Sequence, residues 1–251
     1  HYLSVCGSGF ISRLCLADVA GHGDAVAAVS AQTYDQLRRS VDTIDNRRVL
    51  RGLDRRLARS EIRAMTTAVM ATYFPPSRRL TVSYAGHPEA WLYSQAEGRW
   101  RPIEAEPAPP RAGFVGLPLG TDLAPSFTRR RLKVDMGDRL LLITDGVLEA
   151  TSPDGVEFGH DGLARVLAQH DADIQSVMDR LLGALVAHTG EPDFSHDDVT
   201  VFVGEFVEGP PGSALWHALK NRLGMGPAFV AGIRSRRAPA EGVAPGFRRS
   251  G

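Results

Sequence analysis

The sequence is poor in cysteine and has no long apolar run. Its two cysteines, Cys6 and Cys15, are too few for a disulfide framework, and neither belongs to a C-x-x-C pair of the kind that binds metals. No segment approaches the ~18 consecutive apolar residues of a transmembrane helix, and no signal peptide is recognisable. These absences exclude a disulfide scaffold and a membrane-spanning protein, and they predict a cytoplasmic protein.

The chain also lacks a net charge, but its charge is unevenly distributed. It has 29 basic and 29 acidic residues among 251, and 43% of its residues are hydrophobic, which is typical of a globular protein. Residues 209–251 carry Lys220 and six arginines against Glu241 alone, and they are rich in glycine and proline. We therefore expect a folded domain at 1–208 and a basic, mostly flexible tail at 209–251. Within the tail, Ala214–Leu223 has the spacing of a short amphipathic helix.

Within 1–208, the hydrophobic pattern alternates between strand-like and helix-like segments. Helices are predicted at Asp24–Val41, around Val49–Leu57, at Asp161–His170 and at Asp173–His188. Strands are predicted at Tyr2–Cys6, Phe10–Ala17, Thr66–Phe74, Leu80–Ala85, Ala90–Tyr93, Phe127–Val134, Arg139–Thr144 and Val199–Phe206, with a loop between Pro102 and Pro125. Strands follow one another directly and helices come in adjacent pairs, which indicates an α+β fold with antiparallel sheets.

Three aspartates occur where a hydrophobic strand ends or begins. Asp18 follows Leu14-Cys15-Leu16-Ala17, Asp145 follows Leu140–Thr144, and Asp197 precedes the strand that starts at Val199. Carboxylates at strand ends can converge, and a hard divalent cation such as Mg²⁺ or Mn²⁺ relieves their repulsion. Taken singly, an Asp-Gly pair after a strand is typical of a turn, and an aspartate before a strand is typical of a cap.

Six motifs, taken together and in order, resemble a known family. They are ADVAGHG at 17–23, AGHPEAWLY at 85–93, GLPLG at 116–120, GDRLLLITDGVLEA at 137–150, FG at 158–159 and DDVTVFV at 197–203. Over Tyr2 to Phe206 the chain resembles the PPM-type protein serine/threonine phosphatases, in particular their bacterial SpoIIE/RsbU-like branch. The resemblance implies a four-layer α-β-β-α sandwich, in which helices flank two antiparallel sheets, and a site for two Mn²⁺ or Mg²⁺ ions.

The resemblance also implies roles for individual residues. Asp18 matches the aspartate that bridges the two metals, and the backbone carbonyl of Val19 would help to hold one of them. Asp145 and Asp197 match aspartates that bind the second metal. A further metal-binding aspartate of the family belongs to a glycine-glycine-aspartate element that aligns before His1, so the phosphatase domain at 1–208 is expected to be incomplete at its N-terminus.

Four more residues are expected beside the metal ligands. Gly21 permits a backbone turn, and Gly146 and Asp198 follow two of the matched aspartates. His22 could donate a proton or bind phosphate, although it lies further from the bridging aspartate than the histidine of the eukaryotic members. The alternative for His22 is a role in the turn.

Several other polar residues are weaker candidates for a functional role. His87 of the AGHPE segment is interpreted mainly as shaping the turn between two strands, and the arginines at 129–131 as a solvated strand face, with phosphate steering as the alternative. Ser195, His196 and Asp197 cannot form a hydrolase triad, because consecutive residues do not converge in the required geometry. The chain shows no nucleic-acid-binding module, so no nucleic-acid partner is expected.

The sequence thus predicts a metal-dependent phosphatase of bacterial signalling that hydrolyses phosphoserine or phosphothreonine by a metal-activated water. The resemblance allows an anti-sigma-factor antagonist as the phosphoprotein substrate and a regulatory domain upstream. Two alternatives stay open at this point. One is a degenerate phosphatase fold that binds a phosphoprotein without turnover, and the other is a hydrolase of small phosphorylated metabolites at the same site.

Overall fold

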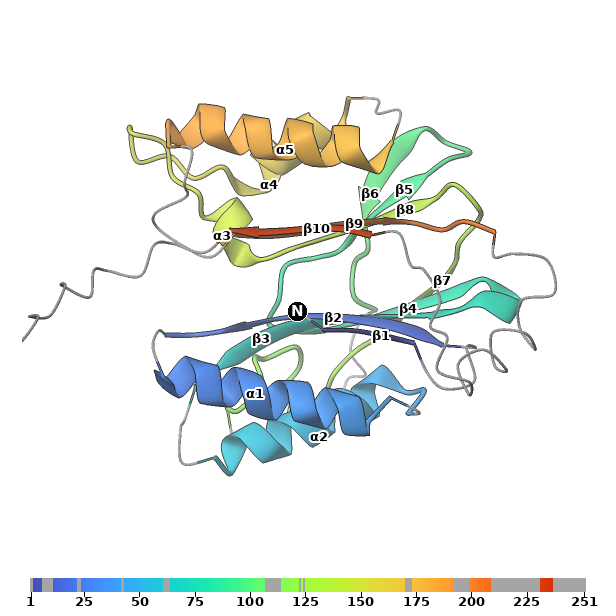
Figure 1. Cartoon of the computed structure of the whole chain (residues 1–251), viewed down its shortest axis with the longest axis vertical. Helices are drawn as coiled ribbons and strands as arrows, with labels where there is room; N and C mark the ends of the chain where they lie inside the picture. The colour runs from blue at the N-terminus through green and yellow to red at the C-terminus, as the bar shows by residue number, and fades with distance from the viewer. Residues whose placement is uncertain are drawn as a thin grey trace, which may run out of the picture.

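A computed structural model gives the fold of the chain at 2–5, 11–21, 24–41, 43–60, 64–106, 114–121, 123, 125–169, 173–191, 199–208 and 231–236. In these ranges the strands form two five-stranded sheets in which every neighbouring pair is antiparallel. Figure 1 shows the two sheets stacked face to face, with helices covering both outer faces. The predicted four-layer α-β-β-α sandwich is confirmed.

The first sheet has the order β1-β2-β3-β4-β7, and the second has the order β10-β9-β8-β5-β6. The strands of the first are β1 (Tyr2–Val5), β2 (Ser12–Val19), β3 (Thr66–Phe74), β4 (Arg79–Ala85) and β7 (Arg130–Lys133). Those of the second are β5 (Trp91–Ser94), β6 (Arg99–Pro102), β8 (Arg139–Ile143), β9 (Val199–Glu205) and β10 (Ala231–Arg236).

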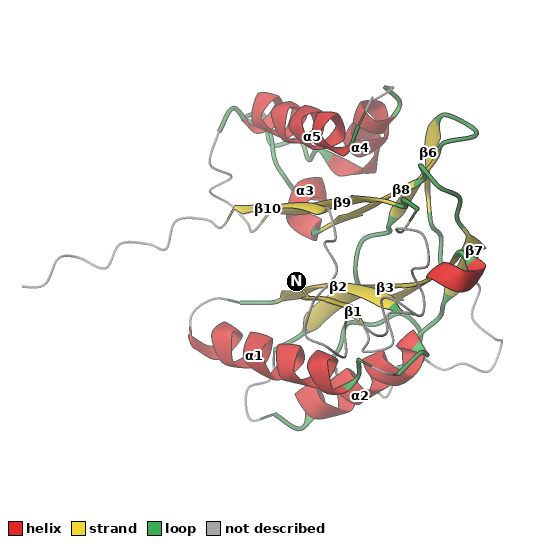
Figure 2. Ribbon diagram, turned by 45° about the vertical axis from the view of Figure 1, so that its right-hand side comes forward, coloured by secondary structure: helices red, strands yellow, loops and turns green. Residues whose placement is uncertain are grey.

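Two groups of helices form the outer layers, as the ribbon in Figure 2 also shows. The first sheet is covered by α1 (Asp24–Arg39) and α2 (Asn46–Ala58), and the second by α3 (Asp145–Leu148), α4 (Gly159–Leu167) and α5 (Ile174–Thr189). A single 3-10 turn, η1 (Pro75–Ser77), joins β3 to β4. No helix in the described ranges is long and apolar enough to cross a membrane.

Strand alternation divides the buried side chains among three layers. In β2, Leu14 and Leu16 belong to the cluster between the sheets, whereas Cys15 packs with α1 and α2 on the opposite face. In β8, Leu140 and Leu142 face the inter-sheet cluster, whereas Leu141 and Ile143 face α4 and α5. Because β8 is buried on both faces, its sequence is a continuous hydrophobic run rather than an alternating one.

Most of the predicted elements are present, and four differences are informative. The strand predicted from Phe127 is shorter and starts at Arg130, and Arg99–Pro102 forms a strand that was not predicted. Asp145 begins the short helix α3, in place of the turn that is typical of an Asp-Gly pair taken singly. Ala231–Arg236 pairs with β9, although it lies in the segment expected to be a mostly flexible tail. The boundary at Glu208 stays a prediction, and Ala214–Leu223 lies outside the described residues.

The GLPLG segment is fixed against the first sheet by backbone contacts at both of its ends. The Gly86 N–H donates to the Gly116 carbonyl at 2.8 Å, and Leu119 exchanges two backbone hydrogen bonds with Thr66. Gly86 has φ +64°, and a Cβ built on it would lie 2.7 Å from Cγ of Pro118. The loop that follows β4 therefore requires glycine at position 86 for both its conformation and its packing.

We expect Gly86→Ala to lower the free energy of unfolding by about 2–5 kcal/mol, since a left-handed alanine costs ~1–2 kcal/mol and overpacking adds ~1–3 kcal/mol. Gly98→Ala is the matched control, because Gly98 has φ +63° but nothing within 4 Å of an added Cβ. The control should lose only the conformational part, about 1–2 kcal/mol. Urea unfolding of both variants checks this, and equal losses would contradict the packing argument.

Candidate active site

Asp18 lies at the end of β2 on the face that looks toward the second sheet. It shares this face with Leu14 and Leu16, and it pairs directly with Thr67 of β3. Its side chain is half-buried. Val19 is the last residue of the strand, after which the Ala20 N–H donates to the Met65 carbonyl at 2.9 Å. Gly21 follows with φ +112°, so the predicted backbone turn at this glycine is confirmed.

Asp145 lies where β8 ends and α3 begins. Its Oδ1 accepts a hydrogen bond from the N–H of Gly146 at 3.1 Å, and its side chain is half-buried whereas Gly146 is buried. The preceding residue, Thr144, fixes this corner to β9: its N–H donates to the Thr200 carbonyl at 3.0 Å, and its Oγ1 accepts from the Thr200 N–H at 2.8 Å. The carboxylate thus projects from a well-anchored strand end.

The two aspartates lie at the same end of the sandwich, one from each sheet. In Figure 1 the chain leaves β2 for α1 at the left-hand side, where α3 also lies. β9 enters the second sheet at this end too, since Val201 pairs with Ile143, the last residue of β8. The structure therefore brings Asp18 and Asp145 to one end of the molecule, as the sequence predicts.

His87 lies between the two sheets at this end. Its side chain is buried, with 7% of the residue exposed, and its Nδ1 lies 2.9 Å from Oγ1 of Thr67, the neighbour of Asp18. Burial lowers the pKa of His87 to about 4, against the opposing effects of the Asp145 charge and the Ile143 carbonyl. A histidine that the sequence assigned mainly to a turn is therefore a buried group that contacts Thr67, the neighbour of Asp18, and feels the charge of Asp145.

The remaining candidates of the site fall outside the described ranges. These are His22, Asp197 and Asp198. Within the part of the chain that is described, no group of three or more His, Cys, Asp or Glu side chains is arranged to hold a metal ion. The described residues thus contribute two carboxylates to the site, and the role of Asp197 stays a prediction. Cys15 is a free, buried thiol whose pKa burial raises to about 12, so it offers no nucleophile here.

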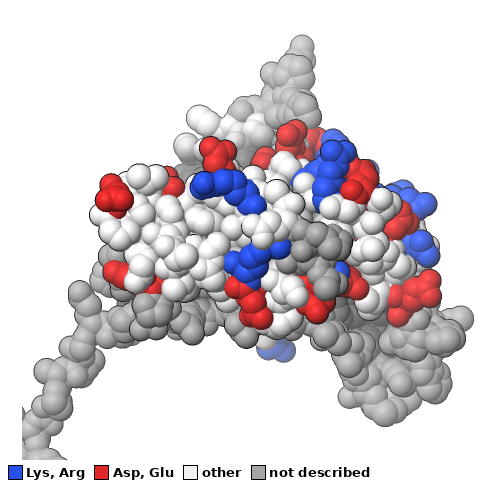
Figure 3. All heavy atoms as spheres, turned by 90° about the horizontal axis from the view of Figure 1, so that it is seen from above, with Lys and Arg blue, Asp and Glu red and all other residues white. Residues whose placement is uncertain are grey.

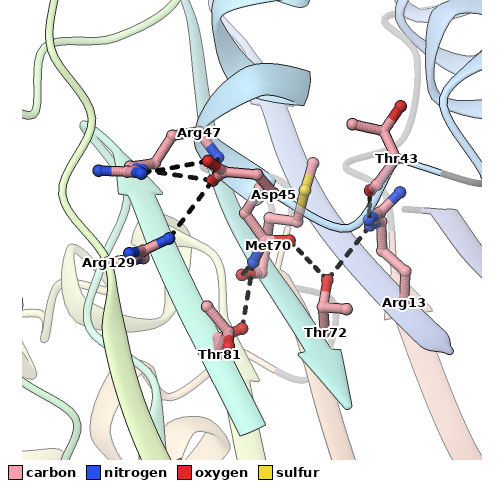
Figure 4. Close-up of polar contacts among 9 residues, drawn as sticks. Arg13, Thr43, Asp45, Arg47, Met70, Thr72, Thr81 and Arg129 are labelled. Atoms are coloured by element: carbon pink, nitrogen blue, oxygen red, sulfur yellow. Dashed lines mark hydrogen bonds and ion pairs between the residues drawn. The ribbon is translucent and has the colours of Figure 1, made fainter. Parts of the chain in front are cut away.

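The arginines at 129–131 lie on β7 and just before it. Arg129 lies 3.9 Å from the Asp45 carboxylate, which Arg47 contacts at 3.1 Å (Figure 4). Although partial burial raises the pKa of Asp45, the hydrogen bonds and charge of Arg47 and the charge of Arg129 hold it below its usual value. Arg130 and Arg131 are exposed on the edge strand, as expected for a solvated face.

The face above α4 and α5 shows acidic and basic side chains interspersed (Figure 3).

Comparison with known proteins decides the family. A family model described as stage II sporulation protein E (SpoIIE) matches residues 12–207, which include β2, β8 and β9. The chain belongs to the SpoIIE family. The SpoIIE-family match contains the two described aspartates and His87, so the site lies within the segment that defines the family.

One relative of this SpoIIE-family chain is a named phosphatase. The chain is 26% identical over 199 residues to the phosphoserine phosphatase RsbU of Bacillus subtilis, covering 76% of this chain and 54% of RsbU. The RsbU and RsbW domains of a Mycobacterium tuberculosis protein superpose with a TM-score of 0.65 at 25% identity, covering 83% of this chain and 57% of that one. The chain thus spans little more than half the length of these relatives.

The fold is shared more widely. The PP2C phosphatase domain of SpoIIE from Bacillus subtilis, solved with a fragment of its regulatory domain, superposes with a TM-score of 0.61 at 18% identity, covering 77% of this chain and 53% of that one. The SiaA-PP2C domain of Pseudomonas aeruginosa gives a TM-score of 0.62 at 18% identity, covering 78% and 76% of the two chains. The four-layer sandwich of this SpoIIE-family chain is therefore the PP2C fold.

Proposed function

We propose that this chain is a metal-dependent protein phosphatase that hydrolyses phosphoserine or phosphothreonine in a signalling protein. The observation that carries the proposal is the position of Asp18 and Asp145, which lie where one strand of each sheet ends, at the same end of the sandwich. Membership of the SpoIIE family and the similarity to the phosphoserine phosphatase RsbU support the choice of substrate class.

The donor set at this end suits a hard divalent cation. Asp18 and Asp145 are half-buried carboxylates, and oxygen donors of this kind favour Mg²⁺ or Mn²⁺ over softer metals. We propose that Asp18, the Val19 carbonyl, Asp145 and Asp197 hold two Mn²⁺ or Mg²⁺ ions. When bound, such a pair of ions supplies an activated water and stabilises the charge of a phosphoryl group.

The chain's own residues have a defined part in this proposal. Asp18 and Asp145 provide the negative charge that retains cations at the site, and partial burial strengthens that interaction compared with bulk water. Thr144 and Thr200 fix the corner from which Asp145 projects. We further propose that the partner is a phosphoprotein, with an anti-sigma-factor antagonist as the first substrate to test, and that the protein acts in the cytoplasm.

Hydrolysis of p-nitrophenyl phosphate and of phosphoserine peptides by the 251-residue chain tests the proposal. We expect turnover that requires Mn²⁺ in excess, stops on addition of EDTA, and favours phosphoserine over phosphotyrosine peptides. Turnover that EDTA leaves unchanged would contradict the metal-dependent mechanism. Binding of Mn²⁺ and of a phosphoprotein without any turnover would contradict the enzyme assignment and favour the degenerate binding module.

A further inference from the structure

His87 is placed between the sheets by a rigid piece of backbone. It follows Gly86, whose φ of +64° turns the chain out of β4 and whose N–H is bound by the Gly116 carbonyl. A bridge between Gly86 and Ala68 ties the same turn to β3. The backbone on the N-terminal side of His87 is thereby held to β3 and to the GLPLG segment. The position from which the imidazole projects is therefore fixed.

His87 lies near residues of both sheets. Its Nδ1 is 2.9 Å from Oγ1 of Thr67 in the first sheet. Its Nε2 is buried and has no hydrogen-bond partner in the described residues, while the Ile143 carbonyl of the second sheet and the charge of Asp145 are near enough to affect the pKa of the ring. Because a carbonyl only accepts hydrogen bonds, a proton on Nε2 is favoured over one on Nδ1. Nδ1 then accepts the hydrogen bond that the Thr67 hydroxyl donates.

Each of these neighbours stands next to a proposed metal ligand. Thr67 pairs directly with Asp18, and Ile143 lies two residues before Asp145. Most other described side chains of the layer between the sheets form an apolar cluster, whose packing fixes distances but does not orient polar groups. The hydroxyl of Tyr84 in this layer bonds to Ile103 and Ala90, and not to Asp18 or Asp145. A directional group at this point would set the orientation of one strand end relative to the other.

We propose that His87 is a positioning residue, whose imidazole connects Thr67 beside Asp18 to the end of β8 beside Asp145 and so holds the two carboxylates in register. This inference rests on the proposed phosphatase function and adds a residue to its site. Groups that orient metal ligands in this way typically affect metal affinity or activity by about 10–100-fold when they are removed.

Thr67 offers the sharpest test, because its hydroxyl can be removed without changing the shape of the side chain. We expect Thr67→Val to lower kcat on a phosphoserine peptide by about tenfold and to weaken Mn²⁺ binding by a similar factor, with KM for the peptide within about twofold of wild type. Thr67→Ser keeps the hydroxyl and should restore most of kcat. His87→Leu should lower kcat at least as much as Thr67→Val.

Ser83→Ala is the matched control. Ser83 is fully buried in β4 of the same sheet, and its Oγ has no hydrogen-bond partner in the described residues. It pairs with Met70, whose side chain packs in the cluster under α1 and α2. It therefore lies on the face away from the site, and its loss should leave kcat and Mn²⁺ affinity unchanged. Circular dichroism melts of all four variants show whether each one folds.

The outcomes separate this inference from the proposed function. If the wild-type chain shows no Mn²⁺-dependent turnover, the proposed function fails, and the ¹⁵N shifts of the His87 ring then test the arrangement alone. We expect Nδ1 to be unprotonated and to accept the hydrogen bond of the Thr67 hydroxyl, and a proton on Nδ1 would overturn the arrangement. If the wild type is active, normal kcat in Thr67→Val, or equal losses in Thr67→Val and Thr67→Ser, would overturn the positioning role.

Discussion

Asp145→Asn and Asp18→Asn should each abolish most of the Mn²⁺-dependent phosphatase activity. Asparagine keeps the shape of the side chain but removes the charge that holds the cation, so the core and the strand ends remain intact. Because loss of a residue that only supports a metal ligand already costs about 10–100-fold, loss of a ligand itself should lower kcat/KM by at least about a hundredfold. Calorimetric titration with Mn²⁺ should show a parallel loss of affinity.

The same substitutions should leave the metal-free protein as stable as wild type or slightly more stable, since they remove one of two carboxylates at one end of the sandwich. Asp135→Asn is the matched control. Asp135 precedes β8, at the opposite end of the strand from Asp145, and its side chain is 69% exposed beside Arg78. It should keep full activity. Unchanged Mn²⁺ binding in both Asp18→Asn and Asp145→Asn would rule out a metal site at these residues.

Asn46→Ala should have the largest effect on stability among the substitutions considered. Asn46 is fully buried at the start of α2, and its Nδ2 donates to the carbonyls of Met70 in β3 and Thr81 in β4, at 3.0 and 3.1 Å. Its Oδ1 accepts from the Thr72 hydroxyl at 2.6 Å (Figure 4). A single side chain therefore joins a helix to two strands.

Thr72 extends the same network to β2. Its Oγ1 also accepts from the buried guanidinium of Arg13 at 3.2 Å, and Arg13 in turn donates to the carbonyls of Ser40 and Thr43 between α1 and α2. Alanine at position 46 would leave the Thr72 hydroxyl and two strand carbonyls without this partner, inside the protein. Each unsatisfied buried group costs about 1–3 kcal/mol.

We therefore expect Asn46→Ala to lower the free energy of unfolding by about 3 kcal/mol or more, and the melting temperature by roughly 6–12 °C for a domain of this size. Asn46→Asp should be at least as damaging, because a carboxylate cannot donate to the two carbonyls. Arg51→Ala, on the exposed face of α2, should change stability by less than about 0.5 kcal/mol. Asn46→Ala within about 1 kcal/mol of wild type would refute the role of the network.

The sequence was sufficient to place Asp18 and Asp145 at strand ends, because the signal for that placement is local. Each lies at the end of a strand whose hydrophobic pattern is unambiguous, and the strand end defines the position of the carboxylate. The helix α5 is equally readable, since Asp173 caps its first turn and Gly190 ends it with φ +72°. Information of this kind lies within a few neighbouring residues.

Asn46 and His87 could not be assigned in this way, because their partners come from distant parts of the chain. An asparagine at the start of a helix reads as a cap, yet Asn46 bonds to residues 24 and 35 positions away. His87 reads as part of a turn, yet it contacts Thr67 and lies beside the end of β8. Only the pairing of strands in space brings these groups together. The hydrophobic periodicity of one strand or helix does not predict which strands pair.

The order of strands in the sheets has a consequence for synthesis on the ribosome. The first sheet needs β7 to cover the edge of β4, but β7 is made only after β5 and β6, which belong to the second sheet. β5 pairs with β6 on one side and with β8 on the other, so one edge of β5 stays unpaired until β8 has been made. Neither sheet is therefore encoded by one continuous half of the gene. A nascent chain that ends before residue 133 would expose strand edges in both layers, so the domain should acquire its stable structure in one late, cooperative step rather than sheet by sheet.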